Sequence, residues 1–434
     1  MGLKTSHAIA LPRLALFVLL AWALVQASLA QSSATGFAPA QRVGYGIGDQ
    51  WEPAIAADGR GHIYILFPQY GPVPGCSGCA APSMSISISA DNGTTWRTTR
   101  PLFISTTGQF DPQIVVDPAD KQTVYASWLQ NNKHDVMVAR SQDFGRTWNL
   151  AVAERSNDDA DKPVLAVRGA DVYVGFNHER HFIVSASHDY GETFSPVTIN
   201  ADAAPGWSLG GGATVDPDGG VYFSWTAYAR QDLDRQPVSI YVSRSADLGK
   251  TWSTSQLDVS SAPPNCQAEG CEAEYLGAQV ALTSDAAGTI YALWNAGTVN
   301  GGPERVYFSS STSGGATWSA KIDVSSAGAQ VEHCFPAIAS GAAGDVRIAW
   351  MDTRQAPLWN VFERSSSNGG ATWSAETKLS AAARGYDYIL PNGFKFPFGD
   401  YFSMAIDDLD ATHVVWGAGR NYRSPGSIWY AHGR

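Results

Sequence analysis

The sequence predicts an all-β fold in which four-stranded antiparallel sheets are arranged as the blades of a β-propeller. Three observations support this prediction. A short turn motif recurs six times, a pair of apolar strands recurs seven times, and no window of the chain keeps a sustained helical periodicity. We expect seven blades, and a six-bladed ring with an accessory hairpin is the alternative.

The turn motif has the spacing Ser-x-Asp-x-Gly-x-Thr-Trp, and its clearest copy runs from Ser245 to Trp252. The Asp and the hydroxyl groups can bond the backbone of their own turn, and Gly can adopt a left-handed conformation. The Trp then starts the next strand as its first large apolar side chain. The motif is therefore predicted to fasten a hairpin and not to catalyse a reaction. The copies begin at Ser89, Ser141, Ser187, Ser245, Ser311 and Ser366.

This motif resembles the Asp-box, or BNR, repeat of sialidases and related β-propellers. Four copies keep the Asp, and the last two copies carry Ser313 and Asn368 in its place. The resemblance implies one propeller domain over residues 31–434. A function has to be argued from the site, because one fold can carry many activities.

A pair of strands joined by a polar turn forms the second repeat and precedes each turn motif. Its seven copies lie at 53–58 and 63–67, 112–117 and 124–128, 163–167 and 172–176, 212–216 and 221–225, 279–282 and 290–294, 336–339 and 346–350, and 402–407 and 413–416. The seventh copy has no turn motif behind it, and the chain stops after a third strand, 428–431. The alternating segment Phe37–Val43 is expected to supply the missing strand and so close the ring.

The N-terminus has the order of a secretory signal peptide. Lys4 and Arg13 precede an apolar run from Leu14 to Val25, and small residues follow up to Ala30. The run is too short to span a bilayer. We therefore expect residues 1–30 to be removed and the mature protein to be exported to the periplasm or the extracellular space.

The mature chain is acidic. Loss of Lys4 and Arg13 leaves 27 of the 29 basic residues against 40 acidic ones, a net charge of −13. Such a surface repels phosphate backbones and anionic lipids, so neither nucleic-acid binding nor membrane insertion is expected.

The five cysteines suit an oxidising compartment. Cys76 and Cys79 are close enough in sequence to pair, as are Cys266 and Cys271, which leaves Cys334 as a free thiol. Their spacing does not fit a zinc site. No segment has the ligand pattern of a calcium loop or a phosphate cradle, so we expect neither a metal nor a cofactor.

The turn motifs join the third and fourth strands of each module, so all six are predicted to lie on one rim of the propeller. The loops before the first strands and after the second strands then meet on the opposite rim, around the central channel. We expect any site on that opposite rim. Its polar and aromatic side chains include Asp49, Gln50, Glu52, Gln69, Tyr70, Asp111, Gln130, Asp161, Lys162, Arg180, Tyr228, Glu272, Glu274, Glu332, His333, Asp352, Arg354, Asp400, Tyr401 and Arg420.

For a sialidase, the resemblance implies three arginines that hold a substrate carboxylate, a Tyr nucleophile with a Glu partner, and an Asp that acts as acid and base. The matching candidates are Arg180, Arg354 and Arg420, with Tyr401, Glu272 or Glu274, and Asp400. The chain departs from the sialidase pattern in its first module. That module reads Gln50-Trp51-Glu52-Pro53, and the mature chain contains no Arg-Ile-Pro.

A different glycosidase mechanism is the alternative. Glu272 or Glu274 together with Asp352 or Asp400 would act as acid and base on a neutral sugar. The aromatic loop 386–398 leads into the seventh module on the same rim, and its Tyr388 and Phe396 offer faces for sugar rings. Its rings would otherwise plug the channel or pack on the last blade.

The sequence therefore favours an exported, sialidase-like propeller that acts on a glycan as an exo-acting glycoside hydrolase. The alternative is a non-catalytic propeller that binds a glycan or a protein at the same rim. Cleavage of a glycoside would separate the two hypotheses.

Overall fold

The computed structural model describes residues 1–2, 36–178, 180–200, 206–229, 236–264, 276–355, 358–381, 383–384, 399–418 and 426–434. Within residues 37–433, the described strands form seven antiparallel sheets. Each sheet is one blade, so the prediction of a seven-bladed β-propeller is confirmed and the six-bladed alternative is wrong.

Blades 1 to 7 are numbered in chain order, and the strands of each blade are given in order from the channel outwards. Blade 1 contains β2 (Asp49–Gln50), β3 (Ala54–Ala57), β4 (Ile63–Tyr70), β5 (Ser83–Ser89) and β6 (Arg100–Pro101), with β2 and β3 both paired to β4. Blade 2 contains β7 (Phe110–Val116), β8 (Val124–Gln130), β9 (Asp135–Ser141) and β10 (Asn149–Arg155). Blade 3 contains β11 (Asp161–Arg168), β12 (Asp171–His178), β13 (His181–Ser187) and β14 (Ser195–Thr198).

The remaining blades repeat this order. Blade 4 contains β15 (Trp207–Val215), β16 (Val221–Tyr228), β17 (Val238–Ser245) and β18 (Ser253–Ser260). Blade 5 contains β19 (Val280–Ser284), β20 (Ile290–Gly297), β21 (Glu304–Ser311) and β22 (Ile322–Asp323). Blade 6 contains β23 (His333–Ser340), β24 (Val346–Gln355), β25 (Leu358–Ser366) and β26 (Thr377–Lys378), with β27 (Ala383–Arg384) also paired to β25. Blade 7 contains β28 (Ser403–Ile406), β29 (Thr412–Ala418), β30 (Ser427–Gly433) and β1 (Gln41–Val43).

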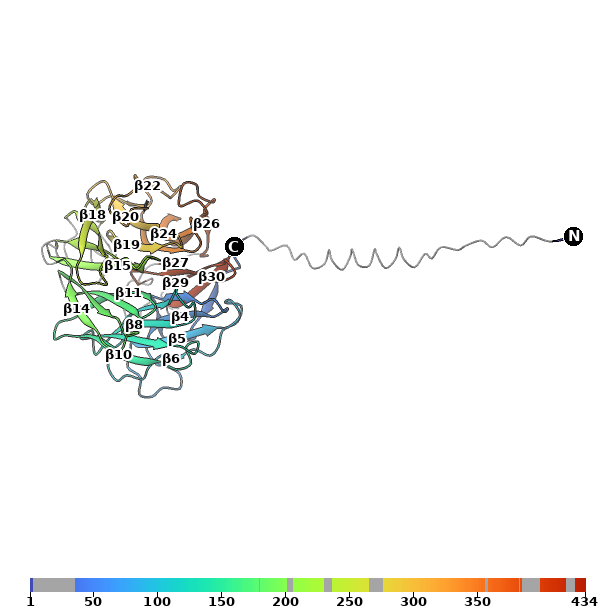
Figure 1. Cartoon of the computed structure of the whole chain (residues 1–434), viewed down its shortest axis with the longest axis horizontal. Coiled ribbons are helices and arrows are strands. Elements are labelled where there is room, and N and C mark those ends of the chain that lie inside the picture. The colour runs from blue at the N-terminus through green and yellow to red at the C-terminus, as the bar shows by residue number, and fades with distance from the viewer. Residues whose placement is uncertain are drawn as a thin grey trace. The chain divides into compact units, whose positions relative to one another are not determined.

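The first strand of the chain closes the ring, as the sequence predicts. Strand β1 pairs antiparallel with β30, with Gln41 opposite Tyr430 and Val43 opposite Ile428. The innermost strands contact one another in ring order, and β28 of blade 7 meets β3 of blade 1. In Figure 1 the outermost strands β6, β10, β14, β18 and β22 lie at the periphery, and β11, β15 and β19 lie nearer the centre.

The turn motif has the hydrogen bonds expected of a hairpin fastener. In blade 4, Ser245 Oγ donates to Asp247 Oδ1 at 2.8 Å and accepts from the Gly249 amide at 2.9 Å. The Asp247 carboxylate accepts from the Thr251 amide at 2.8 Å and from its hydroxyl at 2.6 Å. Gly249 has φ +80°, a conformation that costs Gly little. The predicted structural role of the motif is confirmed.

Each turn motif also packs on the blade before it. In four of the six motifs the Gly lies against a Tyr side chain near the start of the preceding blade's second strand, whereas Gly93 meets Tyr430 and Gly370 meets Phe308, which both lie in third strands. Thus Gly145 of blade 2 meets Tyr64 of blade 1, and Gly249 of blade 4 meets Tyr173 of blade 3. The motif therefore fastens neighbouring blades as well as its own hairpin.

The blade that lacks a turn motif is held differently. Blade 7 has none, and the corresponding Tyr position in blade 6 is Arg347. Its guanidinium donates to Thr412 Oγ1 at 2.8 Å and to the Asp410 carbonyl at 3.0 Å, and it pairs with the carboxylates of Asp345 and Asp410. Blade 7 has no motif that could pack on a Tyr side chain of blade 6. Hydrogen bonds and an ion pair of Arg347 join the two blades instead.

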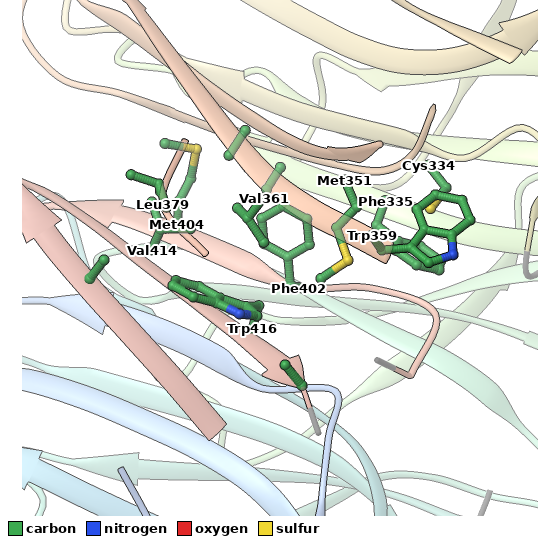
Figure 2. Packing of buried hydrophobic residues seen from close by; sticks show 14 of the residues in the cluster. Cys334, Phe335, Met351, Trp359, Val361, Leu379, Phe402, Met404, Val414 and Trp416 are labelled. Carbon is green, nitrogen blue, oxygen red and sulfur yellow. The ribbon is translucent and has the colours of Figure 1, made fainter. Parts of the chain in front are cut away.

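The hydrophobic core is divided among the interfaces between blades. The described residues form seven buried clusters, and each combines side chains of two neighbouring blades, including blades 7 and 1. The cluster between blades 6 and 7 is drawn in Figure 2, where the Phe402 ring lies among Val361, Met351 and Trp416. Because each cluster needs two blades, the blades stabilise one another around the ring.

The cysteines agree with the prediction where they are described. Cys76 and Cys79 form a disulfide, and Cys334 is a free, buried thiol. The predicted pair Cys266 and Cys271 lies outside the described residues. Within the described parts of the chain we find no helix long and apolar enough to cross a bilayer.

Candidate functional site

The two rims of the propeller carry different connections between strands. The turn motifs connect the third and fourth strands at one rim. At the other rim, which we call the loop rim, the innermost strands begin and the second strands end around the channel. The candidate site lies where four blades meet at the loop rim.

A backbone feature redirects side chains at the start of the innermost strands. In three blades the residue before a proline occupies a bulge in the innermost strand, and it has a left-handed φ: Asp111 (52°), Lys162 (47°) and Phe335 (55°). Glu52 has the same conformation (φ 52°) at the break between β2 and β3. A following proline disfavours the right-handed helical region, and a bulge redirects the side chain it carries. The local sequence therefore positions these side chains.

The first carboxyl pair joins blades 1 and 7. The Glu52 and Asp400 carboxyl groups share a hydrogen bond, and both residues are buried, with 5% and 2% of their surface exposed. Lys162 of blade 3 donates to Asp400 Oδ1. Burial raises the pKa of Glu52 well above its usual value, and the charge of Asp400 raises it further, so Glu52 is the protonated partner.

The second carboxyl pair joins blades 2 and 3. Asp111 and Asp161 share a hydrogen bond, and Lys133 donates to Asp161 Oδ1 at 3.1 Å. Burial raises the pKa of Asp111 to about 6, although Lys133 and Lys162 oppose the rise. Burial also acts on Asp161, but the two lysines outweigh it and hold the pKa of this carboxyl below its usual value. Each pair thus contains one carboxyl whose pKa is raised by burial, and one lysine bonds the other carboxyl.

One oxygen of the buried Asp111 carboxyl has no donor among the described residues. As an acceptor, Asp111 Oδ2 has no hydrogen-bond partner among the described residues, although the residue is only 6% exposed. A protonated Asp111 donates one hydrogen bond to Asp161, which pairs the buried carboxyl through one of its two oxygens. When Asp111 is ionised, this oxygen lacks a donor.

Aromatic rings surround the charged groups. Lys162 Nζ lies 4.5 Å from the centre of the Tyr401 ring, and the Trp51 and Tyr70 rings stack at 4.1 Å. Burial, and then the charges that Glu52, Asp111 and Asp400 carry once they are ionised, raise the pKa of both Tyr70 and Tyr401 well above the usual value. The Tyr401 hydroxyl has no partner in the described part of the chain.

A cavity of about 190 Å³ opens beside these groups in the channel. Asp111, Lys162, Asp400 and Tyr401 line it, together with the backbone of the glycine run 210–212. A Cβ on Gly211 would overlap the Val280 carbonyl, so the glycines let blades 4 and 5 approach closely at this level. The lining of the cavity therefore combines charged side chains with the closely packed backbone of the glycine run.

Close packing fixes the segment that carries Asp400 and Tyr401. Gly399 has φ +70°, and a Cβ there would overlap the Cγ atom of Glu52. The next residue along, Phe402, is buried among the side chains of blades 6 and 7, as Figure 2 shows. The contacts on both sides hold Asp400 and Tyr401 against the channel.

The sequence matches the model of one protein family. A family model described as a BNR repeat-like domain matches residues 32–275, more than half of the chain. The chain belongs to this BNR repeat-like family.

Several solved structures resemble this BNR propeller at low sequence identity. A polysaccharide lyase of family PL25, an ulvan lyase, is 13% identical, with 89% of this chain and 95% of that chain covered and a TM-score of 0.50. A protein of unknown function from Dyadobacter fermentans DSM 18053 is 13% identical over 92% of this chain and 98% of that chain, with a TM-score of 0.49. The Hadza microbial sialidase Hz136 is 14% identical over 89% and 66%, with a TM-score of 0.46. At such identity the lyase shows the fold alone. No curated protein sequence gives a significant match.

Two of the site residues predicted from the sequence lie in the cluster. Asp400 and Tyr401 both line the cavity. Arg354 and Asp352 do not line it. The Arg354 guanidinium pairs with Asp352 at 2.6 Å and with Glu376 at 2.5 Å, and it stacks 3.7 Å from the Phe362 ring centre. Arg180 lies in the exposed turn after β12.

The other predicted site residues lie outside the described part of the propeller. These are Glu272, Glu274, Tyr388, Phe396 and Arg420. Where the chain is described, no group of three or more His, Cys, Asp and Glu side chains is arranged to hold a metal ion.

Sequence reasoning placed Glu52, Asp111, Asp161 and Lys162 on the correct rim but did not select them as site residues, and it missed Lys133. One signal in the sequence would have selected three of them. Glu52, Asp111 and Lys162 each precede a proline at the start of an innermost strand, so they occupy equivalent positions in consecutive modules. A charged residue at that position is aimed at the channel.

Proposed function

We propose that this BNR propeller is a glycoside hydrolase whose acid and base are carboxyl groups of the channel cluster. One observation carries the proposal: burial raises the pKa of Asp111, whereas Asp400, which lines the same cavity, is paired with Lys162. Glycoside hydrolysis needs one protonated and one ionised carboxyl beside the same bond.

Two carboxyl groups that line the cavity fit these roles. Asp111, with a pKa of about 6, donates its proton to the leaving oxygen as the glycosidic C–O bond breaks. Asp400 accepts a proton from the water that attacks the anomeric carbon, and Lys162 balances its charge. The proton returns to Asp111 through solvent. The free hydroxyl of Tyr401 is placed to bond a hydroxyl group of the sugar.

A sialidase-type exoglycosidase is the second candidate. It is favoured by Tyr401, which lies beside carboxylates as the Tyr nucleophile of that mechanism would. The expected arginines are a weaker fit, because Arg354 is held by Asp352 and Glu376 and the described lining of the cavity contains no arginine. A non-catalytic propeller that binds a glycan or a protein at the loop rim is the remaining alternative.

Hydrolysis of a panel of aryl glycosides, including an aryl sialoside, tests these alternatives. Asp111→Asn and Asp400→Asn should each lower kcat at least about a hundredfold if the residues act as acid and base. Asp158→Asn, an exposed change away from the cavity, is the control and should keep full activity. Cleavage of the sialoside alone would favour the sialidase mechanism. Glycan binding without any cleavage would favour the binding module.

We also propose that the protein is exported after removal of residues 1–30. The Cys76–Cys79 disulfide supports this location, because such bonds persist in oxidising compartments. N-terminal sequencing of the protein recovered from the periplasm or the medium tests the proposal, and a start near Gln31 is expected.

A further inference from the structure

A buried histidine on the loop rim accepts a hydrogen bond from a serine. His333 begins β23 of blade 6 and is completely buried. Its Nδ1 lies 2.9 Å from the Glu304 carbonyl oxygen, and its Nε2 lies 2.8 Å from Ser325 Oγ. Because a carbonyl oxygen can only accept, Nδ1 carries the proton and the unprotonated Nε2 accepts from the serine hydroxyl. The backbone therefore fixes the tautomer in which the imidazole is a base toward Ser325.

Ser325 lies in the loop between β22 and β23, and hydrogen bonds hold this loop in place. Arg305 of β21 donates to the carbonyls of Ser325 and Gly328 at 3.1 and 3.0 Å. The Asp323 carboxylate accepts from Arg305 Nε at 2.8 Å and from the Ser325 amide at 3.0 Å. The serine is partly exposed. Its hydroxyl is thus held against His333 in a loop at the surface.

Two hydrogen-bond donors lie beside the same hydroxyl. The Ala327 amide is 3.2 Å and Arg354 Nη2 is 3.4 Å from Ser325 Oγ. Asp352 Oδ2 lies 3.9 Å from His333 Nε2, where it faces the charge that the imidazole gains when it takes a proton. Acyl transfer needs a nucleophile, a base of fixed tautomer and donors for a developing oxyanion. All three are present on this part of the rim.

From this arrangement we propose that Ser325 and His333 form a second active site, which hydrolyses short carboxylic esters. Ser325 Oγ attacks the ester carbonyl carbon as its proton passes to His333 Nε2, and the Ala327 amide and Arg354 bond the oxyanion. The C–O bond to the alcohol then breaks, and His333 returns the proton to the leaving alkoxide. Water attacks the acyl-serine in the same way, so one ester and one water yield an acid and an alcohol.

The groups around Ser325 indicate which esters fit. The side chains that bond this part of the loop, Arg305, Asp323 and Arg354, are charged and offer no apolar surface for a long acyl chain. An acetyl group needs no such surface. A neutral carbonyl stabilises the charged imidazole less than the carboxylate of a full triad would, so an alkoxide leaving group is favoured over the poorer amine. None of these residues is in the described lining of the channel cavity, so the second site does not depend on the proposed hydrolase.

Labelling of the full mature chain with an alkyl fluorophosphonate tests the proposal, because this reagent reacts with a serine that a base activates. Peptide mass spectrometry should find the adduct on Ser325. Hydrolysis of 4-nitrophenyl acetate measures turnover, and Ser325→Ala should lower kcat/KM at least about a hundredfold. The matched control is Ser253→Ala, which changes an exposed serine of β18 in blade 4. It should label and hydrolyse as the wild type does.

The pH dependence of labelling reports on His333. Burial and the charge of Arg305 lower the pKa of His333 from 6.5, although Asp352, the Glu304 carbonyl and Asp323 oppose the fall. The imidazole is therefore neutral at pH 7.5 and above. The labelling rate should stay constant between pH 7.5 and pH 8.5, whereas a hydroxyl without a base would react about tenfold faster for this rise in hydroxide concentration.

The outcomes decide the proposal without a glycoside, so they are separate from the test of the proposed function. An adduct on another residue, or none on Ser325, overturns the second site. This result needs no variant, so it holds even if Ser325→Ala fails to fold. Acetate hydrolysis that Ser325→Ala leaves unchanged overturns it too, and so does a labelling rate that rises in proportion to hydroxide.

Discussion

Asp111 and Asp161 show how the same side chain acquires opposite properties across a few ångströms. Both are buried, and burial alone disfavours a charged carboxylate. Lys133 bonds Asp161 directly, so the lysine outweighs burial and the pKa of Asp161 falls. Asp111 bonds neither lysine, so burial prevails and its pKa rises to about 6. The difference arises from which carboxyl each lysine can reach.

This contrast predicts how stability depends on pH. The pKa of Asp111 is higher in the folded chain, at about 6, than its ordinary value of 3.8. Its contribution to stability is therefore complete below about pH 3.8 and is lost as the pH rises through 6. Asp111→Asn cannot ionise, so at pH 8 it should be more stable than the wild type by up to roughly 3 kcal/mol. At pH 4 the difference should be small.

Urea unfolding of both proteins at pH 4 and pH 8 measures the effect. Asp158→Asn serves as the exposed control and should shift stability equally at both values. A stability difference for Asp111→Asn that does not change with pH would show that folding does not raise the pKa of Asp111.

At the scale of elements, the six turn motifs show which parts of the motif matter. In blade 6 Asn368 replaces Asp, and its Oδ1 still accepts from the Thr372 amide at 2.9 Å while its amide donates to the Thr372 hydroxyl at 2.8 Å. In blade 5 Ser313 keeps only a single oxygen, which accepts from the Thr317 amide at 2.9 Å. The turn tolerates the loss of charge but keeps the bond to the amide.

The same comparison predicts the effect of mutations in blade 2. Asp143 accepts from Ser141 Oγ at 2.9 Å and from the Thr147 amide at 2.8 Å. Asp143→Asn should be nearly neutral, because Asn368 shows that the bonds survive. Asp143→Ala should cost roughly 1 kcal/mol, the net value of a partly exposed hydrogen-bonded cap. Equal losses for Asn and Ala in urea unfolding would show that charge, and not the bond, stabilises the turn.

Much of the fold could be predicted because its chemistry is local. The turn motif, the strand pair and the alternating segment at 37–43 each occupy a short window of sequence. The channel cluster is different, because Lys162 and Asp400 are 238 residues apart and meet only when blade 7 closes beside blade 1. An ion pair between residues so far apart in the sequence leaves no pattern in either segment. The sequence therefore predicted the rim on which these side chains lie, but not that Lys162 and Asp400 would pair.

The closed ring depends on the contacts of blade 7 with blade 6 and with blade 1, which differ from the contacts between the other blades. Blade 7 lacks a turn motif, so Arg347 bonds it to blade 6. On its other side, β1 completes the sheet from the N-terminal end of the chain, and Gln41 Nε2 donates to the Gly93 carbonyl of blade 1 at 3.0 Å. Since the carboxyl pair of Glu52 and Asp400 spans blades 1 and 7, the site requires this closure.

Deletion of residues 36–43 should therefore open the ring at blade 7. The deletion removes the three paired residues of β1 and the buried Val43, whose burial alone is worth roughly 2 kcal/mol. It also leaves the edge of β30 unpaired, and an unpaired edge promotes association between chains. The truncated chain should unfold at lower urea concentration and form dimers or larger species in light scattering. A synthetic peptide of residues 36–43 should restore both properties by pairing with β30, whereas a peptide of the same composition in scrambled order should not. A truncated chain that stays monomeric and as stable as the intact one would show that blade 7 is held by Arg347 and its packing on blade 6 alone.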